Sequence, residues 1–103
     1  MSGRSVTYYA VTRERGENWD ARLPMRQQEQ WDEHAAFMDT LADEGFVVLA
    51  GPLGDGEKKF LLIIDAGDEQ EIAARLADDP WTPMGLLSIA TVERWEILLG
   101  TPE

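Results

Sequence analysis

Apolar and polar positions follow helical spacing in some segments and strand spacing in others, and together they predict six elements. Residues 6–12 are mostly β-branched and aromatic, which predicts a first strand. The polar segment 13–23 predicts a loop that is longer than most connections. Over 24–44, apolar side chains recur every three to four positions. That spacing predicts a helix that opens at Pro24 and ends at Gly45.

The middle of the chain predicts a pair of strands. The apolar run 46–50 is unbroken, which indicates a strand covered on both faces. Gly51-Pro52-Leu53 interrupts it, and Asp55-Gly56 supplies a hairpin-type turn. Residues 59–65 then form the returning strand.

The last third predicts a short helix and a final strand. Asp68 and Glu71 have the spacing of a capping box at the start of a helix, which Asp79-Pro80 ends. An irregular segment, 81–84, separates this helix from a long strand at 87–99. Apolar residues occupy both faces of that strand: Val92 and Leu98 on one, Ile89, Trp95 and Ile97 on the other.

The order strand, helix, strand, strand, helix, strand predicts an α+β ferredoxin-like βαββαβ sandwich. In that fold a four-stranded antiparallel sheet carries two helices on one face. The length fits a single domain over residues 1–103. Because apolar residues also mark the uncovered face of the sheet, we expect a homodimer whose sheets pack face to face.

Charge and composition exclude several function classes. The formal charge is −11, with 20 acidic and 9 basic residues, so binding to nucleic acid or to an anionic membrane surface is not expected. The chain has no cysteine, which excludes disulfides and thiol catalysis and fits a cytoplasmic location. The first residues become polar too early for a signal peptide, and no apolar run is long enough for a membrane span.

His34 is the only histidine of the chain. At about 100° per residue it lies on the apolar stripe of the predicted helix, between Met38 and Leu41, so it points inward. One interpretation is a core histidine that binds a backbone carbonyl. The other is a proton carrier, since histidine is the side chain that ordinarily titrates near neutral pH.

A proton-carrying histidine is oriented by a carboxylate partner, and two candidates lie at breaks between elements. Asp79 precedes Pro80, and Asp55 lies in the hairpin turn, although both dipeptides are also ordinary turn sequences. Arg13 and Arg15 could receive an anionic substrate, but we expect them to be ordinary surface charges.

Several short motifs occur in a fixed order: His34-x-x-Phe37, Gly45, Gly51-Pro52-Leu53 with Asp55-Gly56, Asp79-Pro80 and Trp95. In this order they resemble the YCII-related family. The resemblance implies a ferredoxin-like fold that dimerises into an α/β barrel. It also implies a cleft with a His–Asp pair, which maps to His34 and Asp79.

Two functions therefore remain open. The first is a cofactor-independent enzyme in which His34 and Asp79 transfer protons on a small cyclic or aromatic substrate, as an isomerase or lyase. Tyr8, Pro52 and Asp55 are the predicted substrate contacts. The second is a non-catalytic dimeric domain that binds a small ligand. We expect no metal and no cofactor, because one histidine with carboxylates is a poor ligand set for zinc or copper and nothing resembles a haem-binding signature.

Overall fold

The computed structural model describes residues 6–100 and contains one four-stranded sheet and two α-helices. The predicted domain, 1–103, extends beyond these residues at both ends. In chain order the elements are β1 (Tyr8–Arg15), a 3-10 turn η1 (Met25–Gln27), α1 (Trp31–Asp43), β2 (Val47–Leu53), β3 (Lys59–Asp65), α2 (Glu69–Ala77) and β4 (Leu87–Trp95).

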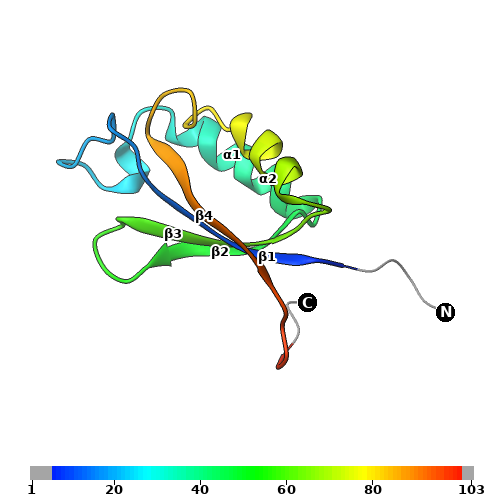
Figure 1. The fold of residues 1–103 in the computed structure, drawn as a ribbon. Helices are drawn as coiled ribbons and strands as arrows, with labels where there is room; N and C mark the ends of the chain where they lie inside the picture. Colours follow the sequence, from blue (N-terminus) through cyan, green and yellow to red (C-terminus); the bar gives the residue numbers. More distant parts are fainter. Residues whose placement is uncertain (1–5, 101–103) are drawn as a thin grey trace.

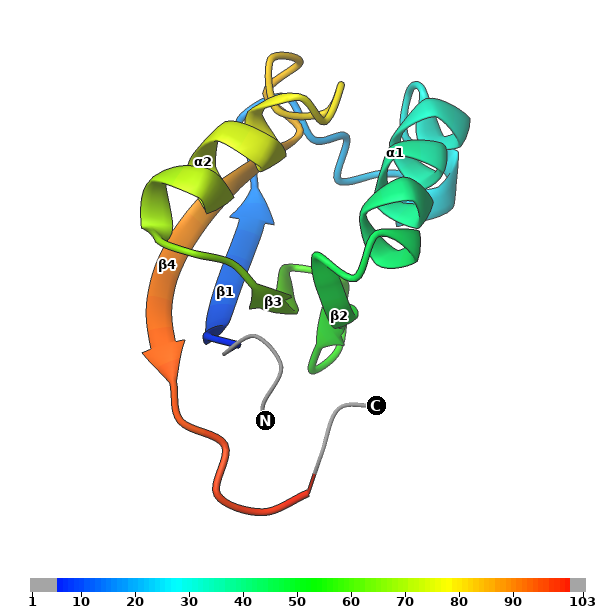
Figure 2. The same cartoon turned by 90° about the vertical axis from the view of Figure 1, so that its right-hand side faces the viewer.

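All strand pairs are antiparallel, and their order across the sheet is β2-β3-β1-β4. Both helices cover the same face, and the other face is bare (Figures 1 and 2). This confirms the predicted α+β ferredoxin-like arrangement. None of the helices in residues 6–100 is long and apolar enough to cross a membrane.

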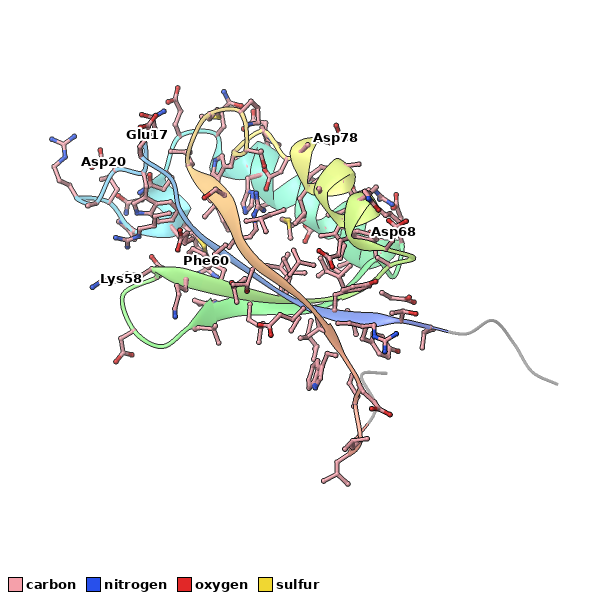
Figure 3. All side chains as sticks on the ribbon, in the orientation of Figure 1. Glu17, Asp20, Lys58, Phe60, Asp68 and Asp78 are labelled. Atoms are coloured by element: carbon pink, nitrogen blue, oxygen red, sulfur yellow. The ribbon has the colours of Figure 1, made fainter. Side chains whose placement is uncertain are left out.

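The core lies between the sheet and the helices, and Figure 3 shows side chains filling this layer. Alternation along β1 sends Tyr9, Val11 and Arg13 toward the helices, and all three are buried. One buried cluster joins the middle of the sheet to both helices: Tyr9, Val11, Leu41, Phe46, Val47, Leu62, Ile64, Ala66, Ile72 and Leu76. A second cluster fills one end of the layer: Trp19, Phe60, Trp81, Leu86 and Leu87.

The first strand and the first helix differ from their predicted bounds. β1 continues to Arg15, because its pairing with β3 and β4 extends through Glu14. The helix begins at Trp31, not at Pro24, which instead precedes η1. The buried Gln28 side chain bonds to backbone groups of Asp20 and Leu23, and this pins the segment to the preceding loop.

The second strand does not stop at Gly51-Pro52 but runs to Leu53. A proline is tolerated there because β2 is an edge strand, where a missing backbone N–H need not break a ladder. Leu49 lies on the face of the sheet that carries no helix, and it is 59% exposed. The expectation that both of its faces are covered is therefore wrong for the described chain.

The last strand ends at Trp95, so residues 96–99 are not part of the sheet. A bulge lies within it, because Thr12 pairs with Thr91 whereas Arg13 pairs with Ile89. Ile89 is thereby placed on the helix side, while Trp95, which pairs with Tyr8, lies on the open side. The expectation that Ile89 and Trp95 share a face is wrong for this reason.

The start of α2 follows the predicted capping pattern. The Asp68 carboxylate accepts a hydrogen bond from the backbone N–H of Glu71 at 2.8 Å, and the Glu71 carboxylate accepts one from Gly67. Asp68 and Asp78 mark the two ends of this helix in Figure 3.

Replacing Asp68 by alanine removes the N-cap acceptor, and we expect the free energy of unfolding to fall by about 1 kcal/mol. Asp68→Asn keeps an acceptor oxygen and is expected to stay near the wild-type value. Urea unfolding followed by circular dichroism measures both variants. Equal losses in the two would contradict this assignment of the cap.

Candidate active site

The candidate site is built around the carboxylate of Asp79, which is fully buried in the turn that follows α2. His34 on α1 donates from Nδ1 to this carboxylate, at 3.0 Å from Oδ1 and 2.9 Å from Oδ2. Arg13 on β1 donates from Nη1 to Oδ2 at 2.9 Å. The backbone N–H of Trp81 donates to Oδ1 at 2.9 Å. One carboxylate thus joins a strand, a helix and a turn.

Burial and the neighbours of Asp79 act on its pKa in opposite directions. Burial by itself raises the pKa, because it penalises the charged form. The hydrogen bond and charge of His34 lower it, as do the bonds from the Trp81 N–H and from Arg13. The net result is a pKa below the usual 3.8, so Asp79 is ionised at neutral pH.

Arg13 is only 2% exposed, so the expectation of an ordinary surface charge is wrong. Its second terminal nitrogen donates to the hydroxyl of Thr82 at 3.0 Å, and that hydroxyl donates onward to the carbonyl of Leu76. The Nε–H of Arg13 is buried and has no acceptor within residues 6–100.

The ring of His34 lies against the indole of Trp81. The two rings are parallel within 3° and their centroids are 3.9 Å apart. Trp31 contacts the same ring at 5.7 Å, tilted by 46°. No hydrogen bond of Nε2 to another residue of the described part is present, so this nitrogen stays available while Nδ1 serves Asp79.

A cavity of about 160 Å³ adjoins His34 and Arg13, between α1 and the sheet. Its walls are mainly apolar: Met25, Trp31, Met38, Pro52, Phe60 and Leu62. Ala50 and Pro52, which are exposed on the edge strand β2, line the side that opens to solvent. An apolar pocket with a few polar groups is typical of small-molecule sites.

The predicted site residues divide into two groups. The structure brings His34, Asp79 and Pro52 together, Asp79 by its bond to His34 and Pro52 as part of the cavity wall. Asp55 lies in the exposed hairpin turn and does not line the cavity. Tyr8 pairs with Trp95 on the open face of the sheet, away from His34. Of the two carboxylates considered as partners for His34, Asp79 is the one in contact.

Arg15 is the other arginine expected as a surface charge. It holds the β2–β3 turn next to the cavity. It donates to the carbonyls of Gly56 and Glu57, and its guanidinium lies 4.9 Å from the centre of the Trp19 ring. The Glu57 carboxylate accepts from the backbone N–H of Met25 at 2.8 Å. These bonds tie the β2–β3 turn to the segment before α1.

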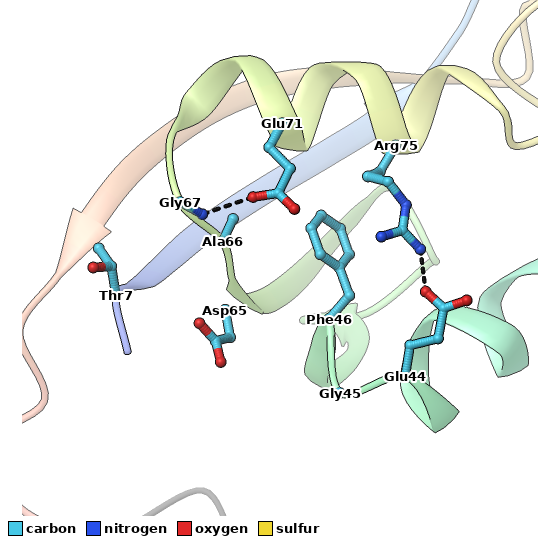
Figure 4. Close-up of a pocket in the computed structure, with 9 residues that line it drawn as sticks. All are labelled: Thr7, Glu44, Gly45, Phe46, Asp65, Ala66, Gly67, Glu71 and Arg75. Atoms are coloured by element: carbon cyan, nitrogen blue, oxygen red, sulfur yellow. Dashed lines mark hydrogen bonds and ion pairs between the residues drawn. The ribbon is translucent and has the colours of Figure 1, made fainter. Parts of the chain in front are cut away.

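A second pocket, of about 290 Å³, lies where α1 ends and α2 begins (Figure 4). Its charged groups already serve the fold: Arg75 pairs with Glu44 and lies over the Phe46 ring, and Glu71 binds the backbone of Gly67. Within residues 6–100, no group of three or more acidic or histidine side chains could hold a metal ion. This pocket has no counterpart to the His34–Asp79 contact.

Comparison with known proteins agrees with the fold. A family model for the YCII-related domain matches residues 7–96. No curated protein matches the chain. Among solved structures, 5-chloro-2-hydroxyhydroquinone dehydrochlorinase (TftG) from Burkholderia phenoliruptrix AC1100, in complex with 2,5-dihydroxybenzoquinone, is similar at 23% identity and a TM-score of 0.58. The similarity covers 86% of this chain and 93% of that one.

The buried pairing of Asp79 predicts a dependence of stability on pH. Since its pKa is lowered in the folded state, its stabilising contribution is complete above the ordinary aspartate pKa of 3.8 and is lost as the pH falls below that value. We expect Asp79→Asn to lose about 3–5 kcal/mol at pH 6, because Arg13 keeps a buried charge without its partner. The difference from wild type should shrink toward pH 3.

Urea unfolding of both proteins between pH 6 and pH 3 measures this difference, and effects of the other carboxylates cancel in it. Asp55→Asn, which alters an exposed turn carboxylate, is the control and should follow wild type at every pH. A constant gap between wild type and Asp79→Asn would contradict the prediction.

Proposed function

The chain belongs to the YCII-related domain family, and on that premise we propose that it is a cofactor-independent enzyme that acts on a small cyclic or aromatic molecule. His34 is the general base and acid, and Asp79 orients it. The observation that carries the proposal is a histidine that is bonded to a buried carboxylate through Nδ1 and that also lines an apolar cavity. The small-molecule dehydrochlorinase that shares the fold supports the same class of substrate.

The proton transfer uses the neutral ring. With Nδ1–H donated to Asp79, Nε2 carries a lone pair that can take a proton from a substrate in the cavity. The carboxylate then stabilises the imidazolium that forms. Arg13 lines the same cavity, and its positive charge can stabilise negative charge that develops on a substrate oxygen.

Two reaction types suit a lone proton carrier. In an isomerisation, His34 returns the proton to another atom of the same substrate. In an elimination, a C–H or O–H bond breaks, its electron pair forms a new double bond, and the leaving group departs with the electron pair of its own bond. The proton held on His34 then passes to solvent. Dehydrochlorination, the reaction named for the similar structure, is an elimination of this kind.

We predict that His34→Ala lowers the rate of any such reaction by about 10²–10⁴-fold, the usual contribution of a general acid-base group. A first assay is chloride release from chlorinated hydroxyhydroquinones, followed by a screen of small phenols and lactones. Asp55→Asn serves as the control and should keep the wild-type rate. Full activity in His34→Ala would remove the hypothesis.

A non-catalytic ligand-binding domain is the alternative, and a comparison of ligand binding with turnover separates the two. Ala50→Leu adds bulk at the mouth without altering His34 or Asp79, so it should weaken binding of 2,5-dihydroxybenzoquinone measured by calorimetry. If wild type and His34→Ala bind this probe equally and neither turns over any member of the screen, the binding domain is the correct function.

The open face of the sheet supports the proposed homodimer. Leu49, Leu53 and Trp95 on this face are 59%, 38% and 44% exposed, and no helix of the described chain covers them (Figure 1). Large exposed apolar surfaces of this kind are typical of interaction sites. A second copy that packs sheet to sheet would remove them from water.

Charges placed on that face should separate the dimer. We expect Leu49→Glu combined with Trp95→Glu to halve the mass measured by light scattering, because two like charges on each copy would meet in the interface. Asp39→Lys, on the exposed side of α1, should leave the mass unchanged. A wild-type protein that is monomeric at high concentration would disprove the proposed dimer.

A further inference from the structure

Asp79 alone does not determine the orientation of the His34 ring. Both carboxylate oxygens contact the same ring nitrogen, Nδ1, at 3.0 and 2.9 Å. The ring can still rotate about its Cα–Cβ and Cβ–Cγ bonds, and a contact at one ring atom restrains that rotation only in part. Turning would move Nε2 away from the cavity, where a proton carrier needs it.

The face of Trp81 removes this freedom. Its indole lies parallel to the imidazole within 3°, at a centroid distance of 3.9 Å, and so fixes the plane of the ring. Trp31 is more distant and tilted by 46°, so it bounds the ring without defining its plane. The plane set by Trp81 and the bond to Asp79 together leave His34 one orientation.

Trp81 can fix the ring because it is itself immobilised. It is fully buried, and its indole N–H donates to the carbonyl of Glu29, just before α1, at 2.7 Å. Trp19 packs edge-on against it at 5.8 Å. Its backbone N–H holds Oδ1 of Asp79 at 2.9 Å. One residue therefore contacts both members of the pair, the carboxylate through its backbone and the imidazole through its side chain.

We propose that Trp81 is a positioning residue that aligns His34 with Asp79 and keeps Nε2 directed at the cavity. The inference rests on the proposed function, because the direction of Nε2 matters only if His34 transfers a proton to or from a substrate. Its test does not, because the ring can be observed without a substrate.

The experiment uses the single histidine of the chain. With ¹⁵N-labelled histidine, two-bond ¹H–¹⁵N spectra report which ring nitrogen carries the proton, and one residue gives one set of signals. In wild type we expect only the Nδ1–H tautomer of the neutral ring. In Trp81→Leu we expect both tautomers, and exchange of the Nδ1 proton with solvent roughly two- to tenfold faster, the equivalent of one lost aromatic pair.

Two further variants separate positioning from general loosening. Trp81→Phe keeps an aromatic face and should restore the single tautomer. Trp19→Leu removes another buried indole from the same cluster, yet it contacts Trp81 only edge-on and should leave the His34 signals unchanged. Trp81→Met fills more of the vacated volume and replaces the leucine variant if that protein does not fold.

Two results would overturn the inference: a single tautomer with wild-type exchange in Trp81→Leu or Trp81→Met, or an equal disturbance of His34 in Trp19→Leu. Failure of the proposed function is a different observation. His34→Ala with full activity would defeat the function and leave the tautomer results as they are.

Discussion

The rest of the structure depends on one buried carboxylate. Asp79 has no exposure to water, and an unpaired charge in that position costs far more free energy than a domain of this size has to lose. Its oxygens therefore need donors, and they receive them from β1, from α1 and from the backbone of the turn after α2. Arg13 supplies the compensating charge. A shift of any one element would leave a buried group unpaired.

This requirement explains why the site lies at one end of the helix layer. The cluster at the middle of the sheet is mainly aliphatic, and the cluster around Asp79 is mainly aromatic. Flat rings leave room for the polar contacts and exclude water from them. Three of the four tryptophans of the chain, Trp19, Trp31 and Trp81, lie there. Trp31 and Trp81 lie directly against the His34 ring, and Trp19 packs behind them against Trp81.

Sequence periodicity was sufficient for most of the fold. β3 and the cap of α2 follow the predicted pattern, since local residues decide both. The predicted ends of helices and strands are wrong where a contact with a residue far away in the sequence determines them. Segment 24–30 has a helix-compatible pattern, but the buried side chain of Gln28 binds a loop. The strand at Gly51-Pro52 continues only because it lies at the edge of the sheet, which no local pattern reveals.

The site was predictable to a similar depth. The helical position of His34 gave its inward direction, and Asp79 was one of two carboxylates considered. Arg13 was missed because a charged residue in a polar stretch is ordinarily exposed. The two-residue spacing of β1 could have indicated its burial, since Tyr9, Val11 and Arg13 lie on the same face of the strand. Trp81 lies in a segment without a periodic pattern, so the sequence carries no information about the direction of its side chain.

The arrangement of charges explains why the histidine, and not the aspartate, can carry a proton. With its pKa lowered by His34, Trp81 and Arg13 despite burial, Asp79 stays ionised throughout the range in which a histidine ordinarily titrates. The imidazole therefore always faces a negative partner, and that partner does not compete for the proton. Low polarity around the pair strengthens the interaction further. Burial of an isolated carboxylate would cost stability. With Arg13 beside it, the buried Asp79 stays charged and can orient His34 as a proton carrier.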